Sequence, residues 1–298
     1  MCILITGGGG FVGCHLIRLL NKIYPDRQII VIDQHIPNYQ FDDALKAEYI
    51  LGDTVDIVDI MRNYPRPDIV FHLGEFSRIR PSFSMIKDVW HSNCAGTFQV
   101  IQFCSQHQIK LIYTGSSSKF GDKNNENMSP YAWFKAKNIE LIKNYSQWFG
   151  LEYRIGYLCN VYGPGQINSG PFATVIGIFE QQYIENMPLT VIAPGNQRRS
   201  FTHVDDICAG LLQLIDYPKN DEFLLGHSKD YSVIEVARLF QRDYVFIPEQ
   251  PGERFKPPQF DNRAQTELAW QPQQQLDTYI ADFIVRADTQ RRNERYAI

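Results

Sequence analysis

Short apolar runs alternate with longer amphipathic segments along the first half of the chain. The apolar runs predict six strands, at residues 2–6, 29–33, 48–53, 68–73, 110–116 and 152–160. Segments with helical spacing of apolar residues predict helices at 11–23, 84–106 and 129–149. Buried strands that alternate with helices favour an α/β fold with a doubly wound parallel sheet.

The alternation changes after about residue 160. A Gly- and Pro-rich loop at 162–171 precedes a predicted helix at 173–187, a short strand at 189–193 and a helix at 204–215. A further helix at 231–240 begins with a capping-box pattern, with Ser232 as the cap and Glu235 three residues later. We therefore expect a sheet domain of residues 1–160 with about 200–217. A smaller C-terminal α+β lobe would contain 161–199 and 218–298.

Composition excludes several classes of protein. With 44% hydrophobic and 21% charged residues, the 298-residue chain has the composition of a globular domain, and its formal charge of −4 gives no basic face for nucleic acid. Its six cysteines form no CxxC pair, so we expect no metal site and buried, reduced thiols. No signal peptide and no apolar run of membrane-spanning length is apparent, so we expect a cytoplasmic protein without membrane association.

A glycine-rich turn joins the first predicted strand to the first predicted helix. Gly7, Gly10 and Gly13 repeat at GxxGxxG spacing in "TGGGGFVG". Residues without side chains allow a tight turn and close approach of the backbone to a pyrophosphate, which would face the free N–H groups of the helix. Glycines also mark plain turns, but the position between a buried strand and a helix predicts a dinucleotide site and a Rossmann-type sheet.

Asp33 ends the second predicted strand, twenty residues after Gly13. A carboxylate there can accept both ribose hydroxyls of an adenosine and would repel a 2′-phosphate, so the pattern favours NAD over NADP. The alternative is a loop or capping aspartate. Gly52 and Asp53, at the end of the third predicted strand, lie at the same sheet edge and are candidates for contact with the adenine.

Tyr131 and Lys135 stand four residues apart on the helix that Ser129 and Pro130 begin. An ammonium beside a phenol favours the phenolate, so Tyr131 would be a general base and Lys135 would assist it and bind the cofactor ribose. Ser116, Ser117 and Ser118 follow the fifth strand and include a candidate partner for the substrate hydroxyl. The alternatives are a half-buried aromatic residue and a polar turn.

Several motifs, in this order, resemble those of the extended short-chain dehydrogenase/reductase family, and most closely its NAD-dependent nucleotide-sugar epimerases and dehydratases. The matching stretches are "TGGGGFVG", "FHLGE", "NCAGT", "SSSKFG", "SPYAWFKAK", "NVYGPGQ", "QRRSFTHVDD", "PGERF" and "LAWQP". They cover nearly the whole chain.

The resemblance implies roles for individual residues. Ser116, Tyr131 and Lys135 would be catalytic. The residues implied in cofactor binding are Gly7, Gly10, Phe11, Val12, Gly13, Asp33, Asp53, Thr54, Leu73, Gly74 and Lys135. Those implied in binding a nucleotide-sugar substrate are Asn160, Arg199 and Arg254, together with Glu75 and Ser117 beside the reacting sugar. The family commonly pairs the helices at 84–106 and 129–149 between subunits, so we expect a homodimer, in keeping with apolar residues on nearly every side of the second helix.

Two departures from the family pattern narrow the chemistry. Its dehydratases carry an Asp-Glu pair after the catalytic threonine, where this chain has Ser117 and Ser118. Without those acids, a 4-epimerase that works through a transient 4-keto sugar is favoured. Glu75 replaces an alanine near the expected nicotinamide site, which leaves open a 4-dehydrogenase or 4-ketoreductase acting on a nucleotide-linked hexose or heptose. A non-catalytic NAD-binding regulator is an alternative of another class.

Overall fold

The computed structural model describes residues 2–36, 45–120, 127–252 and 255–296. Its main sheet has seven parallel strands in the spatial order β11-β6-β5-β4-β1-β2-β3, which confirms the predicted α/β fold. These strands are β1 (Cys2–Thr6), β2 (Gln28–Asp33), β3 (Glu48–Leu51), β4 (Ile69–His72), β5 (Lys110–Ser116), β6 (Tyr153–Leu158) and β11 (Asp221–Leu225). The strand order reverses between β1 and β4, where ligands of such sheets bind.

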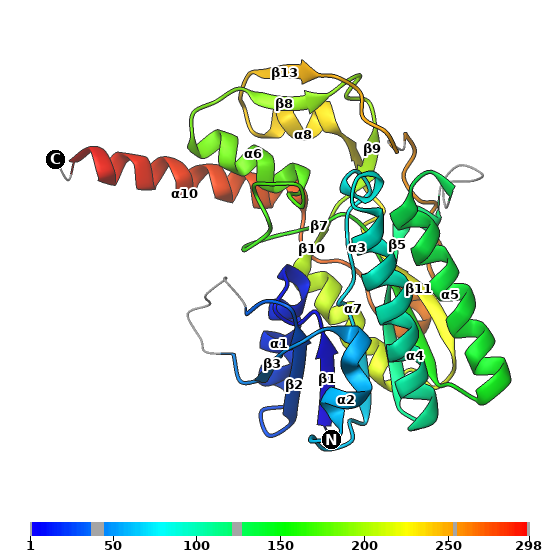
Figure 1. Ribbon diagram of the computed structural model, residues 1–298. Coiled ribbons are helices and arrows are strands. Elements are labelled where there is room, and N and C mark those ends of the chain that lie inside the picture. Colours follow the sequence, from blue (N-terminus) through cyan, green and yellow to red (C-terminus); the bar gives the residue numbers. More distant parts are fainter. Residues whose placement is uncertain (1, 37–44, 121–126, 253–254, 297–298) are drawn as a thin grey trace.

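Helices cover both faces of the sheet (Figure 1). One face packs against α1 (Phe11–Ile23), α7 (Val204–Asp216) and α9 (Arg263–Leu268), and the other against α2 (Ile57–Met61), α4 (Thr97–Gln106) and α5 (Pro130–Phe149). Successive residues of β1 point to opposite faces, so Ile3 and Ile5 belong to the first core cluster and Leu4 to the second.

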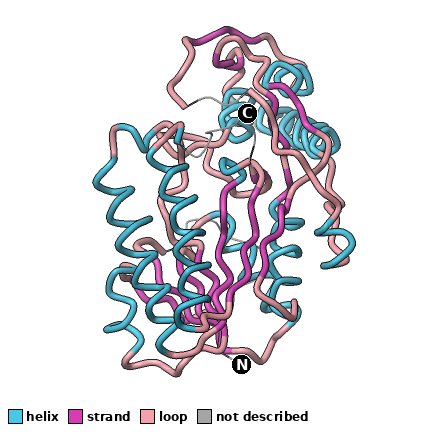
Figure 2. The backbone as a smooth tube through the Cα atoms, turned by 90° about the vertical axis from the view of Figure 1, so that its right-hand side faces the viewer, coloured by secondary structure: helices cyan, strands magenta, loops and turns pink. Residues whose placement is uncertain are grey.

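The C-terminal lobe sits beyond one end of the sheet and has its own core (Figures 1 and 2). Its helices α6 (Val175–Ile184), α8 (Val233–Leu239) and α10 (Leu276–Tyr296) accompany the parallel pair of β8 (Leu189–Ile192) and β13 (Tyr244–Ile247). Two short ladders complete the fold: β7 (Val161–Tyr162) with β10 (Thr202–His203), and β9 (Arg198–Ser200) with β12 (Asp230–Ser232).

The predicted helix at 84–106 is one helical run with a π-helical segment in its middle. It consists of α3 (Ile86–Val89), the π-helical residues 90–96 and α4. Asn93 in this segment accepts from the Phe76 N–H at 2.7 Å and donates to the Phe76 carbonyl at 3.0 Å. Its own backbone carbonyl accepts from the Asn138 side chain of α5 at 2.6 Å. The widened turn therefore ties the loop after β4 to α5.

Strand β11 belongs to the main sheet, whereas the predicted division of the chain placed residues 218–298 in the substrate lobe. It pairs with β6 at the edge of the main sheet, with Phe223 opposite Gly156. Its sequence, "DEFLL", begins with two acidic residues that remain partly exposed, because an edge strand lacks a neighbour on one side. The apolar pattern of this strand is therefore too short to identify it.

The helix-capping predictions are confirmed. The Ser129 hydroxyl accepts from the Ala132 N–H at 3.1 Å, with Pro130 at the first helical position of α5. Ser232 and Glu235 form the reciprocal capping box at the start of α8.

All six cysteines are free thiols, five of them buried and Cys94 partly so. Among the helices of the described residues, none is long and apolar enough to cross a membrane.

A buried arginine fastens β6 to the segment that leads into β11. Arg154 is 1% exposed, and its Nε donates to the Tyr217 carbonyl at 2.7 Å. The same guanidinium also contacts the Tyr153 carbonyl and the Asn220 side chain, and pairs with Glu152. Removal of this side chain would leave buried carbonyls without donors.

We expect Arg154→Met to lower the free energy of unfolding by about 3 kcal/mol, because it removes the buried donor of several hydrogen bonds. Arg62→Met is the control, since the Arg62–Asp59 pair is fully at the surface and should change stability by less than about 1 kcal/mol. Urea unfolding measures both. Equal losses in the two variants would contradict the assigned role of Arg154.

Candidate active site

The candidate residues gather at the carboxyl ends of the parallel strands. Thr6, His72 and Tyr113 lie opposite one another on β1, β4 and β5, because the register pairs Thr6 with His72 and His72 with Tyr113. They form a polar row across the sheet at its switch point, where neighbouring residues of paired parallel strands point to the same face. The glycine-rich turn, the serines after β5 and the start of α5 all lie at this edge of the sheet.

The glycine-rich turn is a cradle that side chains would fill. Gly7 has a φ of +74°, and a Cβ there would lie 2.5 Å from the Gly74 nitrogen at the end of β4. A Cβ on Gly13 would lie 2.4 Å from the Gly7 carbonyl oxygen, so α1 begins directly against the turn. Together with the free N–H groups of the α1 N-terminus, next to Gly10, Phe11 and Val12, this geometry fits a dinucleotide pyrophosphate. Leu73 and Gly74 line the turn from β4.

Asp33 stands at the end of β2 beside this turn. Its carboxylate accepts from the Gly9 N–H at 2.8 Å and from the His35 N–H at 3.0 Å. These bonds fix the carboxylate beside the glycine-rich turn, and its contact with an adenosine ribose stays a prediction.

Asp53 follows β3 and caps the turn that starts at Thr54. Although partial burial opposes it, hydrogen bonds from the Val55 N–H, His91 and Gln34 lower the pKa of Asp53 below its usual value. The Asp53 carboxylate is thus held by neighbouring residues of the protein, and Thr54 is buried against Gly96 of the π-helical segment that precedes α4.

The serines after β5 divide into one partly exposed and two buried residues. Ser116 is partly exposed, and its hydroxyl oxygen accepts from the Ser118 N–H at 3.2 Å. Ser117 and Ser118 are 3% and 2% exposed. Ser116 is therefore the most accessible serine of this motif, and its catalytic role stays a prediction, as does a substrate contact by the buried Ser117.

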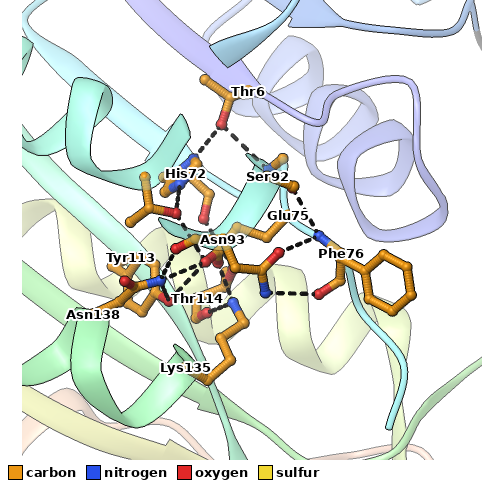
Figure 3. Close-up of polar contacts among 12 residues, drawn as sticks. Thr6, His72, Glu75, Phe76, Ser92, Asn93, Tyr113, Thr114, Lys135 and Asn138 are labelled. Atoms are coloured by element: carbon orange, nitrogen blue, oxygen red, sulfur yellow. Dashed lines mark hydrogen bonds and ion pairs between the residues drawn. The ribbon is translucent and has the colours of Figure 1, made fainter. Parts of the chain in front are cut away.

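Lys135 lies on α5, one turn after Tyr131, and both side chains are largely buried. The Lys135 ammonium forms an ion pair with Glu75 and donates to the Thr114 carbonyl at 2.6 Å (Figure 3). It also lies 4.7 Å from the centre of the Tyr113 ring. The loop after β4, strand β5 and α5 itself therefore fix the position of this ammonium.

The Glu75 side chain points into the protein, whereas the sequence prediction had it contact the substrate. Its side chain is 1% exposed, and its second carboxylate oxygen accepts from Thr97 at 2.9 Å, Tyr113 at 3.0 Å and Asn138 at 2.9 Å (Figure 3). An expected substrate contact is replaced by an internal one, because four donors occupy the carboxylate. Glu75 thereby helps to fix the position of the Lys135 ammonium.

A neutral histidine, His72, extends this hydrogen-bond network to Thr6 at the end of β1. Because Thr97 donates to the Glu75 carboxylate, its oxygen accepts from His72 Nε2 at 2.9 Å, and His72 Nδ1 accepts from the Thr6 hydroxyl at 2.6 Å. Burial, reinforced by Lys135 and opposed by Glu75, lowers the pKa of His72 to about 4. His72 therefore stays neutral at pH 7 and holds a single tautomer.

Arg78, which the sequence did not single out, faces the same site. Its Nε donates to the Phe172 carbonyl at 2.7 Å and its Nη1 to the Ser77 carbonyl at 3.0 Å. Burial lowers the pKa of Arg78 below its usual value, and an electrostatic interaction with Tyr131 opposes that change. No carboxylate among the described residues forms an ion pair with it.

Two of the three residues predicted to bind the nucleotide and diphosphate of the substrate are described by the structure, and they lie where the sheet meets the lobe. The Asn160 side chain donates to the Ser200 carbonyl at 2.8 Å, which places it beside β9 and Arg199. The Arg199 guanidinium contacts the carbonyl of Arg198 at 2.9 Å. Arg254 is outside the described residues.

Residues 3–226 match the model of the NAD dependent epimerase/dehydratase family. The chain belongs to this family. An uncharacterized UDP-glucose epimerase of Bacillus subtilis is 28% identical over 270 residues, which are 81% of each chain. A UDP-glucose 4-epimerase of Thermotoga maritima, solved with UDP-glucose, has the same fold, with a TM-score of 0.85, 22% identity and coverage of 98% of this chain and 99% of that one.

A UDP-glucuronic acid 4-epimerase of Bacillus cereus, solved with UDP-glucuronic acid and NAD, also shares the fold, with a TM-score of 0.83, 24% identity and coverage of 96% and 99%. The chain is thus a member of an NAD-dependent enzyme family, as the motifs predicted. The glycine cradle and Asp33 are the residues of this chain that fit the cofactor.

His72 makes the stability of the protein dependent on pH. A histidine has a pKa of about 6.5 when unfolded, so lowering it to about 4 contributes stability that is present above pH 6.5 and lost as the pH falls toward 4, about 3 kcal/mol in all. We expect His72→Gln to abolish this part of the acid sensitivity. The stability gap between the wild type and the variant should shrink by about 3 kcal/mol from pH 7 to pH 4.

Urea unfolding across this pH range measures the gap. His107→Gln, which changes an exposed histidine, is the control and should follow the wild type. A wild-type-to-His72→Gln gap that is constant with pH would show that His72 is not held neutral.

Proposed function

We propose that the protein is an NAD-dependent nucleotide-sugar 4-epimerase that works through a transient 4-keto sugar, with Tyr131 as the base. The observation that carries this proposal is the position of Tyr131 and Lys135, on a helix that starts at the same sheet edge as the glycine cradle. A base at this edge reaches a sugar bound between the sheet and the lobe. The UDP-sugar ligands of proteins with the same fold support the class of substrate.

Each residue of the site has a defined task in this proposal. Tyr131 takes the proton of the C4 hydroxyl and returns it at the end of the cycle, while Ser116 donates a hydrogen bond to the same oxygen. Lys135 favours the phenolate and holds the ribose of the cofactor. The glycine cradle, Asp33 and Lys135 would hold NAD, which would supply reversible hydride transfer at C4 when bound.

The serines after β5 favour epimerisation over elimination of water. Loss of a 6-hydroxyl needs an acid that protonates the leaving oxygen. The positions that follow Ser116 are Ser117 and Ser118, both buried, and the carboxylate of Glu75 is occupied by Lys135 and three further donors. Among the described residues after β5, no acid therefore stands in the position that elimination would require.

Tyr131→Phe should lower turnover of an accepted nucleotide sugar by roughly 10²–10⁴-fold, because it removes the proton-transferring hydroxyl and leaves the ring in place. Binding of NAD, measured by calorimetry, should be retained. Tyr145→Phe, on the same helix and equally buried, is the control and should keep full activity. Unchanged turnover in Tyr131→Phe would rule out this mechanism.

Product analysis separates epimerisation from net oxidation or reduction. Incubation with UDP-, GDP-, dTDP- and CDP-sugars followed by NMR should give a C4 epimer without accumulation of NADH. Release of a keto sugar with stoichiometric NADH would instead support the 4-dehydrogenase alternative.

We also propose that the protein is a homodimer that pairs the α4 and α5 side of the molecule. Helix α5 buries Ile139 and Ile142 in the core on one face of the sheet, and Phe134 in a smaller cluster with Phe76 and Val89. Large aromatic side chains remain exposed on α5 and on the π-helical segment before α4, namely Trp90, Trp133, Trp148 and Phe149, which are 58%, 41%, 59% and 63% exposed. Exposed apolar groups of this size are typical of subunit interfaces.

Sedimentation equilibrium at micromolar concentration should give twice the mass of the chain. Trp148→Glu should shift the protein toward the monomer, because it places a charge in the buried interface. Val285→Glu, an equally drastic change at an exposed apolar position on α10, should leave the dimer intact. A wild-type monomer would contradict the proposed interface.

A further inference from the structure

Glu75 places a fixed negative charge beside Lys135, in the loop after β4. Its side chain is 1% exposed and forms a buried ion pair with the Lys135 ammonium. The other carboxylate oxygen accepts hydrogen bonds from Thr97, Tyr113 and Asn138 (Figure 3). Burial and the neighbouring Glu75 raise the pKa of Tyr113 well above its usual value, so its hydroxyl keeps its proton and donates. Donors to both oxygens therefore hold this carboxylate in one position.

The Lys135 ammonium has three N–H donors, and the protein itself uses two of them. One donates to Glu75 and one to the Thr114 carbonyl at 2.6 Å. Among the contacts of the described residues, one donor is left for a ribose hydroxyl, which is the contact that the proposed function assigns to Lys135. A cofactor ribose and Glu75 would therefore be hydrogen-bonded to the same ammonium, through different N–H groups.

The nicotinamide ring is bonded directly to the ribose that Lys135 would hold, and the charge of the ring depends on its redox state. The ring is a cation in NAD⁺ and neutral in NADH. A lone ammonium beside the ribose repels the cation and so favours NADH, whereas a carboxylate attracts it and favours NAD⁺. Charges buried as deeply as those of Glu75 and Lys135 are little screened by salt. The charges around this ribose therefore bias the redox form that binds.

Glu75 supplies the negative charge of this buried network. Among the residues labelled in Figure 3, it is the only carboxylic acid. Tyr113 is protonated, and burial keeps His72 neutral at pH 7. Glu75 is therefore the group of this network that can offset the charge of Lys135 at the nicotinamide ring.

We propose that Glu75 sets the redox preference of the cofactor site, by offsetting the repulsion between the Lys135 ammonium and the positively charged nicotinamide. The site then holds NAD⁺ more tightly, relative to NADH, than it would without the carboxylate. This inference rests on the proposed function in one respect, the contact of Lys135 with the nicotinamide ribose, and it leaves the catalytic roles of Tyr131 and Lys135 unchanged. A preference for NAD⁺ suits an epimerase, because return of the hydride to the keto sugar is then favoured.

The ratio of the dissociation constants for NADH and NAD⁺ tests this proposal without any sugar. Competition between the two forms, followed by the fluorescence of bound NADH, measures this ratio on the protein as purified. Glu75→Gln should weaken NAD⁺ relative to NADH by about tenfold, because one negative charge near the cationic ring is lost. Both forms carry the same ribose, so displacement of Lys135 would weaken both alike and leave the ratio unchanged.

Matched variants separate charge from shape. Glu75→Asp keeps the charge and should keep the wild-type ratio within about twofold. Glu75→Ala, which has the residue of the family motif at this position, should shift the ratio as Glu75→Gln does, and it serves in place of that variant if Glu75→Gln does not fold. Glu140→Gln removes an exposed carboxylate from α5 and should change the ratio by less than about twofold.

The outcomes for Glu75 and for the proposed function are separate. A ratio that is unchanged in Glu75→Gln and Glu75→Ala, or that shifts toward NAD⁺, would overturn the role of Glu75. Because the competition needs no sugar, this outcome is distinct from failure of the proposed function, which is absence of nucleotide-sugar turnover in the wild type. A wild type that binds neither form of the cofactor would contradict both proposals.

Discussion

The buried ion pair between Glu75 and Lys135 is the constraint on which the rest of the site depends. Lys135 comes from α5 and Glu75 from the loop after β4, and neither charge could be buried alone without a large free-energy penalty. The pair therefore specifies how α5 docks on the sheet. Removal of either partner would leave the other as an uncompensated buried charge.

The parallel sheet makes such a network possible. Because β1, β4 and β5 run in register, Thr6, His72 and Tyr113 lie side by side and supply hydroxyl and imidazole groups at one edge. The hydrogen bonds then run in one direction, from Thr6 through His72 and Thr97 to the Glu75 carboxylate. The strand that ends at the glycine cradle is thus connected to the lysine of the dyad.

Local signals made much of the fold predictable from the sequence. The strands, the glycine turn and the cap at Ser129 depend on neighbouring residues, and each was found within a few positions of its predicted place. Strand β11 was missed, because "DEFLL" is short and half polar and is identified only by its pairing with β6.

The buried polar contacts around Lys135 and Glu75 were not predictable in the same way. Glu75 and Asn138 are 63 residues apart, and nothing local to either shows that they meet. Tyr113 gave a weak signal, since a hydroxyl in a buried apolar strand needs a partner. Arg78 gave none, because the Phe172 carbonyl that orients its guanidinium is 94 residues away along the chain.

The central claim is reversible oxidation at C4 with a cofactor that stays bound, and an isotope experiment tests it most directly. An accepted nucleotide sugar carrying deuterium at C4 is converted in ordinary water and the product is examined by NMR. The account predicts that the epimer retains the deuterium at C4, because the same hydride is returned. Deuterium found in released NADH or lost to the solvent would contradict it.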